Sequence, residues 1–98
     1  MQLEYIKPTV AFVERLKISD KARVDRVREL FEEFGFSIGP KYVKKVSALG
    51  IWELRAGDVR LLLSIRGKNA ICVHAFYKKT QRLSKADLKL AEMRSEQL

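Results

Sequence analysis

The sequence of 98 residues has the length of one domain. Hydrophobic residues make up 47% and charged residues 33%, which excludes the polar excess of a disordered chain and the cysteine density of a small secreted scaffold. Lys and Arg number 20 against 12 Asp and Glu, so a net charge of +8 attracts polyanions such as nucleic acid or an acidic protein. We therefore expect one globular domain over residues 1–98.

Cysteine, histidine and hydropathy indicate the compartment and the absence of a cofactor. The single Cys72 lies in an apolar run, where a free thiol usually behaves as a small buried hydrophobe, as in a reducing cytoplasm. No apolar stretch approaches the roughly 20 residues of a membrane span, and the N-terminus has no secretion signal. With one His, one Cys and no zinc spacing, we expect no metal and no cofactor.

The first half of the chain predicts one strand and two helices. Residues 2–6 alternate in polarity and end before Pro8, which can open a helix over residues 9–17. Apolar residues recur at steps of three and four from Ser19 to Phe34, which predicts the longest helix, capped at its start by Ser19 or Asp20.

The second half changes to an alternating pattern. Residues 51–55, 59–67 and 70–78 predict three strands joined by short turns at Gly57 and Gly67, an antiparallel meander. A final helix over residues 84–98 starts at Ser84, with Asp87 at capping-box spacing. The predicted order is strand, two helices, three strands and a helix.

Alternation sorts the side chains of the predicted sheet onto two faces. Trp52 and Leu54 form the core side of the first strand in the meander, and Val59, Leu61, Leu63 and Ile65 that of the second. In the third strand the core set is Ile71, Val73 and Ala75, which turns Cys72 outward. The opposite, less covered face then gathers cations and rings: Arg55, Arg60, His74, Lys78 and Phe76, with Tyr77 beside them.

This face has an ordinary interpretation as well as a functional one. Basic residues are common on solvated sheet faces, a lone His is more often structural, and Glu53 can form a cross-strand pair with a neighbouring Arg. As a site, the face has no Ser/His/Asp set, no paired carboxylates and no phosphate-binding glycine loop. It offers cations for phosphate, rings for stacking and groups that move protons, which suits RNA cleaved without metal by attack of a 2′-OH.

A family resemblance adds to this interpretation. The segments IWELRAGDVRLLL and ICVHAFYKKTQRLSKADLKLAEMR, within residues 51–94, resemble the RelE/HigB-type toxins of bacterial toxin–antitoxin pairs, especially their phage-derived branch. The shared pattern is W-E-L-R, a following Arg, H-x-F-x-K-K-T and an A-x-x-R helix. The resemblance implies an α+β fold with a small antiparallel sheet of about four strands, two N-terminal helices on one face and a C-terminal helix.

The resemblance also implies an activity and residue roles. The expected activity is ribosome-dependent endoribonuclease cleavage of mRNA, which inhibits translation and is restrained by a cognate antitoxin, expected to be a helix-turn-helix protein. Arg55 and Arg60 are expected to bind the scissile phosphate, and Lys78 with Lys79 to transfer protons or bind the RNA backbone. His74 is a further catalytic candidate. The RNA-binding candidates are Lys79, Tyr77, Phe76 and Arg82.

Two other functions share the fold or the charge. ParE-type toxins of similar shape bind DNA gyrase without cleaving RNA, and fold alone does not decide between them. A non-enzymatic nucleic-acid-binding regulator is a second alternative, although no helix-turn-helix is evident in this sequence. If Arg60 is a surface cation of the site, Arg60→Ala should abolish cleavage and change stability by no more than about 0.5 kcal/mol.

Overall fold

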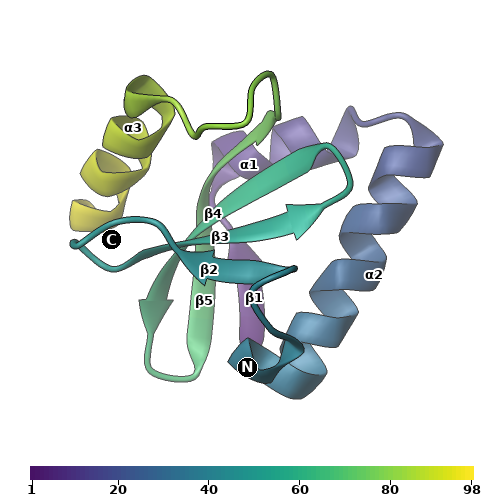
Figure 1. Ribbon diagram of the computed structural model, residues 1–98, viewed down its shortest axis with the longest axis horizontal. Helices are drawn as coiled ribbons and strands as arrows, with labels where there is room; N and C mark the ends of the chain where they lie inside the picture. Colours follow the sequence, from purple (N-terminus) through teal and green to yellow (C-terminus); the bar gives the residue numbers. More distant parts are fainter.

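The sheet that carries the predicted face has five strands and lies between helices on both sides (Figure 1). The computed structural model describes residues 1–98. In chain order its elements are β1 (Gln2–Tyr5), α1 (Lys7–Glu14), α2 (Ile18–Phe34), a 3-10 helix (Gly35–Ile38), β2 (Val43–Lys45), β3 (Ile51–Ala56), β4 (Val59–Arg66), β5 (Asn69–Tyr77) and α3 (Lys85–Glu96). The predicted α+β class is confirmed.

The sheet differs from the expected four-stranded antiparallel one in two respects. Its order is β1-β5-β4-β3-β2, and β1 pairs parallel to β5, so the sheet is mixed. The additional strand β2 has three residues and pairs antiparallel to β3. Three residues are too few to display an alternating pattern, and a parallel pairing between strands far apart in the chain has no local sequence signal.

Helices cover both faces of this sheet. The 15-residue main core lies under α1 and α2 and includes Val24, Phe31 and Leu61, all buried. A second cluster of Ile51, Leu62, Val73 and Ala91 is covered by α3, which lies on the other side of the sheet in Figure 1. The face expected to be less covered is therefore largely buried beneath α3, where it is mostly apolar apart from the Ser64–Ser95 hydrogen bond at 2.7 Å. Its polar residues gather where α3 does not cover the sheet.

A β-bulge corrects the predicted facing of β5. Strand register shifts between Leu62 and Leu63, because Leu62 pairs with His74 while Leu63 pairs with Cys72, so Val73 is the extra residue. Before the bulge, Cys72 faces the main core, whereas Val73 and Ile71 face α3, so the predicted sides of all three residues were wrong. After the bulge the alternation changes phase, and Ala75 faces the main core as predicted.

The helix starts show one confirmed cap and one wrong cap. Ser84 accepts a hydrogen bond from the backbone N–H of Asp87 at 3.0 Å, as the capping-box spacing predicts. Helix α2 begins at Ile18 after Lys17, with no side-chain cap, so Ser19 and Asp20 do not cap it. Asp20 is instead a buried residue of the first turn. None of the helices has the length and apolar character that crossing a membrane requires.

Candidate active site

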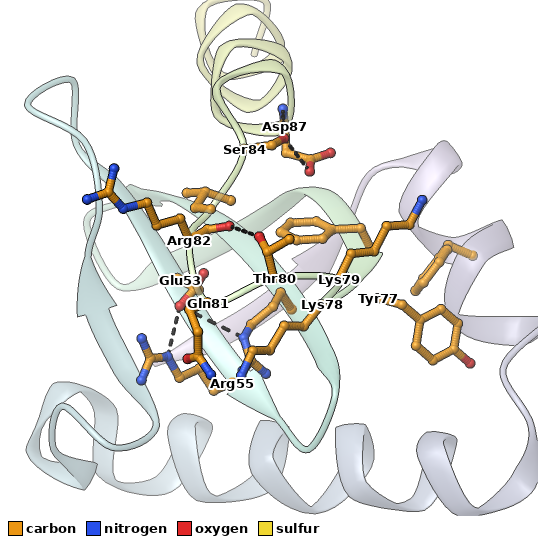
Figure 2. Close-up of a pocket in the computed structure, with 14 residues that line it drawn as sticks. Glu53, Arg55, Tyr77, Lys78, Lys79, Thr80, Gln81, Arg82, Ser84 and Asp87 are labelled. Atoms are coloured by element: carbon orange, nitrogen blue, oxygen red, sulfur yellow. Dashed lines mark hydrogen bonds and ion pairs between the residues drawn. The ribbon is translucent and has the colours of Figure 1, made fainter.

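A groove of about 610 Å³ opens where the β3–β4 hairpin, the end of β5 and the loop before α3 meet (Figure 2). The antiparallel register sets its floor, because Arg55 of β3 pairs with Arg60 of β4, and Arg60 pairs with Phe76 of β5. Its lining residues are Phe12, Glu53, Arg55, Arg60, Phe76, Tyr77, Lys78, Lys79, Thr80, Gln81, Arg82, Leu83, Ser84 and Asp87.

Arg60 is the most constrained cation of the groove. Its side chain is 11% exposed, and Nη1 donates to the carbonyl oxygens of Gly57 at 2.6 Å and Val59 at 3.2 Å. Gly57 has φ 61°, the left-handed conformation that a glycine at the first position of a tight hairpin turn adopts without strain. Burial lowers the pKa of Arg60 from its usual value, yet a guanidinium stays charged in proteins. A fixed positive charge therefore lies in the floor.

Glu53 is the carboxylate that holds the two arginines in place. Its side chain is 7% exposed, and Oε1 accepts a hydrogen bond from Nε of Arg55 at 2.8 Å while lying 4.0 Å from Nε of Arg60. Figure 2 shows Glu53 and Arg55 side by side in the groove, joined by a dashed line. The cross-strand pair of Glu53 is thus present, and it lies within the groove. The ordinary interpretation is confirmed for this pair, and the functional interpretation stays a prediction.

Three exposed cations surround these paired arginines. Lys78, Lys79 and Arg82 line the groove, and their side chains make no hydrogen bond or ion pair. The backbone N–H of Lys78 donates to the carbonyl oxygen of Asp58 at 2.7 Å, which fixes the start of this segment against the β3–β4 turn. Unpaired cations beside a buried, fixed one are suited to bind an anion with several oxygens, such as a phosphodiester.

The two predicted rings lie differently. Phe76 lines the groove and stacks on His74 with ring centroids 5.2 Å apart and planes at 27°. Tyr77 borders the groove, but its ring packs edge-on against Phe12 at 5.7 Å and its hydroxyl donates to Asp20 Oδ2 at 3.0 Å. Desolvation and the hydrogen bond to Asp20 raise the pKa of Tyr77. In Figure 2 the Tyr77 ring points away from the lysines.

His74 lies behind the groove and reaches it through Asp87. Its Nε2 is 2.7 Å from Oδ1 of Asp87, whose Oδ2 accepts from the Ser84 hydroxyl at 2.7 Å. Desolvation raises the pKa of Asp87, but the hydrogen bonds from His74 and Ser84 outweigh it, so the pKa is lowered overall. Asp87 is therefore ionised at neutral pH, and the pair joins β5 to the start of α3.

All the predicted site residues except His74 line one groove. Sequence reasoning missed Asp87 as the partner of His74, because its capping-box spacing already explained its presence. It also missed the loop residues Gln81 and Ser84 as groove walls, since loop geometry leaves no periodic signal. No group of three or more His, Cys, Asp or Glu side chains is placed to hold a metal ion.

Fold and groove together define a small α+β domain with a basic, ring-lined groove at one end of its sheet. A family model described as phage-derived protein Gp49-like (DUF891) matches residues 11–96, most of the chain, so the chain belongs to this family. The family is one of RelE-like toxins of toxin–antitoxin systems, and membership implies an antitoxin partner. A comparison with curated proteins gives no match.

Proposed function

We propose that this toxin is a ribosome-dependent endoribonuclease of the HigB-like branch, which acts in the cytoplasm and inhibits translation by cleaving mRNA. The observation that carries the proposal is the combination of a hydrogen-bonded Arg60, whose side chain is only 11% exposed, with unpaired lysines and a half-buried ring in one groove. A docking surface for a protein partner needs no buried cation in its floor. A reaction in which a phosphodiester gains negative charge benefits from such a cation, because preorganised charge stabilises a transition state most effectively where water is excluded.

The proposed reaction uses the ribose 2′-OH as the nucleophile. Its oxygen attacks the adjacent phosphorus, the bond to the 5′-oxygen breaks, and the products are a 2′,3′-cyclic phosphate and a free 5′-OH. Arg60 and Arg55 stabilise the negative charge of the phosphorane, and Glu53 keeps their guanidinium planes in place. Catalysis by charge and positioning fits the absence of a Ser, Cys or paired-carboxylate nucleophile system in the groove.

Proton transfer falls to the groove lysines. One of the two unpaired lysines in the groove walls, Lys78 or Lys79, accepts the proton of the 2′-OH, and the other donates a proton to the departing 5′-oxygen. Phe76 gives a base a ring to stack on, and Arg82 binds the flanking RNA. Tyr77, in contrast, is held at the groove edge by Phe12 and Asp20. His74 does not line the groove, and its Nε2 is engaged by Asp87, so we assign His74 and Asp87 to positioning the α3 wall.

A gyrase-binding toxin remains the second candidate because it shares the fold. A non-enzymatic nucleic-acid-binding regulator would use the same exposed cations, yet it would not need a buried Arg60. Binding alone would depend on exposed cations such as Lys79 and Arg82, and replacing buried Arg60 by Lys would leave it nearly unchanged. Catalysis would not tolerate that change, because Lys has no planar fork of donors.

The direct test of the chemistry is the identity of the product ends. Cleaved mRNA is expected to carry 2′,3′-cyclic phosphates by mass spectrometry, and a single 2′-deoxy nucleotide at the cleavage position should abolish cleavage there. Cleavage that persists at the deoxy position would exclude attack by the 2′-OH. Absence of cleavage together with inhibited DNA supercoiling would favour the gyrase target instead.

A further inference from the structure

A second pocket, of about 430 Å³, lies beside the groove and belongs to no role assigned so far. It is bounded by β2, the end of the loop before α3 and the first turns of α3. The two cavities share five lining residues: Glu53, Arg55, Gln81, Arg82 and Leu83. They are therefore two adjoining parts of one depression, divided by the segment that carries Gln81 and Arg82.

The second pocket is strongly basic. Its five cations are Lys44, Lys45, Arg55, Arg82 and Lys85. The single carboxylate among its lining residues is Glu53, which is buried and already bonded to Arg55. The pocket thus presents uncompensated positive charge to solvent.

Four of these five cations, all but Arg55, have side chains without a hydrogen bond or an ion pair, and Lys44 and Lys85 are the two that flank the pocket from β2 and from α3. Lys44 pairs with Glu53 in the β2–β3 register and so extends from the same face of the sheet as the groove. Lys85 is the first residue of α3. Both are exposed, and neither side chain makes a hydrogen bond or an ion pair. Nothing in the fold requires a positive charge at either position, which leaves both free for a ligand.

The two ends of the depression differ in charge. At one end, the Tyr77 hydroxyl donates a hydrogen bond to the carboxylate of Asp20. Asp58 lies in the β3–β4 turn beside it. Arg82 lies on the opposite side of the groove from Tyr77 (Figure 2) and also lines the second pocket. The Tyr77 end carries both signs of charge, because Lys78 is bonded through its backbone to the turn that holds Asp58, whereas five cations line the pocket at the Arg82 end, which attracts a polyanion more strongly.

We propose that the second pocket binds the stretch of single-stranded RNA that adjoins the cleaved phosphodiester, with Lys44 and Lys85 each contacting a backbone phosphate. This inference rests on the proposed function and extends it to a neighbouring subsite. Leu83 and Leu88 supply an apolar wall against which a base can pack. The ligand is RNA and not an acidic protein, because the pocket continues directly into the groove that holds Arg60.

Binding of oligonucleotides that cannot be cleaved tests the subsite separately from catalysis. The probes are fluorescein-labelled oligouridylates of about three and about nine nucleotides with 2′-O-methyl riboses. Their binding is measured by fluorescence anisotropy over a series of salt concentrations. Lys44→Ala/Lys85→Ala removes the two proposed contacts. Arg26→Ala/Lys68→Ala is the matched control, since it removes the same charge from two exposed cations that line neither pocket.

The subsite makes a quantitative prediction. For the longer probe, the plot of log affinity against log salt should be less steep by about 1.4 in Lys44→Ala/Lys85→Ala than in the intact protein. If the two proteins bind equally at 1 M salt, the variant should therefore bind about 25-fold more weakly at 0.1 M salt. The three-nucleotide probe fills the groove alone and should show little change. The control variant should retain the slope of the intact protein.

Other results would overturn the proposal in distinguishable ways. Equal losses in both double variants would mean that net charge, and not a site, governs binding. Unchanged binding in Lys44→Ala/Lys85→Ala, with weakened binding in Arg60→Ala, would refute the subsite and leave the groove function standing. No binding of either probe by the intact protein would overturn the subsite, whereas the proposed cleavage is tested separately, in the presence of ribosomes, by primer extension. A loss seen only with a polyglutamate peptide would assign the pocket to an acidic protein.

Discussion

Replacing Arg60 tests the claim that this cation is part of the fold as well as of the site. Arg60→Ala removes a charge-assisted hydrogen bond to Gly57 at 2.6 Å and a longer one to Val59 at 3.2 Å. Such bonds contribute roughly 1.5–3 kcal/mol each when strong. Removing one partner of a buried ion pair can cost about 3–5 kcal/mol, but Glu53 keeps Arg55 at 2.8 Å and is not left alone.

The expected loss in the free energy of unfolding is therefore about 1.5–3 kcal/mol, larger than the roughly 0.5 kcal/mol expected of an ordinary surface cation. Urea denaturation followed by circular dichroism measures it, with Lys79→Ala as the control for an exposed groove cation that has no partner. The control should stay within about 0.5 kcal/mol of the intact protein. If Arg60→Ala also lowers the free energy of unfolding by no more than about 0.5 kcal/mol, the hydrogen bonds of Arg60 do not stabilise the β3–β4 turn.

Three further predictions follow from buried or paired groups. Glu53→Ala leaves two guanidinium groups without their shared carboxylate and should cost about 2–3 kcal/mol in urea denaturation, whereas Glu53→Gln, which retains an acceptor, should cost less. The lowered pKa of Asp87 stabilises the folded state above the pKa of the unfolded chain, and this contribution is lost as pH falls through the folded value. Acid titration of Asp87→Asn should therefore show a smaller loss of stability at low pH than the intact protein; identical curves would contradict the contact with His74. Burial raises the pKa of Cys72 to about 12, so iodoacetamide should alkylate the folded protein slowly even at pH 9 by mass spectrometry, and rapid labelling would contradict its burial.

The alternating half of the chain was predictable because its physics is local. Side chains of β3 and β4 follow strict alternation between glycine turns, so the placement of Leu54 and Arg60 on opposite faces needs no tertiary information. The helix start at Ser84 was equally local, since a side-chain oxygen meets a backbone N–H three residues away. Predictions of this kind account for most of the groove floor.

The features that sequence missed depend on contacts between distant parts of the chain. The bulge at Val73 inverts one half of β5 relative to the other, and alternation cannot locate the residue at which the phase changes. The parallel pairing of β1 and the cover that α3 gives to Leu62 are likewise tertiary choices. The contact of His74 with Asp87 depends on the packing of α3 against β5, because 13 residues separate these two side chains in the chain.

At Asp20, tertiary packing overrides the local preference of an Asp near a helix start for the capping position. Its sequence context favours a helix cap, yet α2 begins earlier and Asp20 is buried, where it accepts a hydrogen bond from Tyr77. A buried carboxylate must find a donor, and the hydroxyl at the groove edge supplies it. The same contact turns Tyr77 away from the groove lysines and so changes the role that the ring can take.

Primer extension on an mRNA in a reconstituted translation reaction, with and without ribosomes, tests the central claim most directly. The comparison uses the intact protein, Arg60→Ala and the control Arg66→Ala. Arg66 lies on the same strand and also donates to a backbone carbonyl, that of Ser95 at 2.7 Å, but lines neither pocket. New 5′ ends that require ribosomes and Arg60 but not Arg66 are the predicted result. Ends that persist in a folded Arg60→Ala variant, or no ends with the intact protein, would contradict the account.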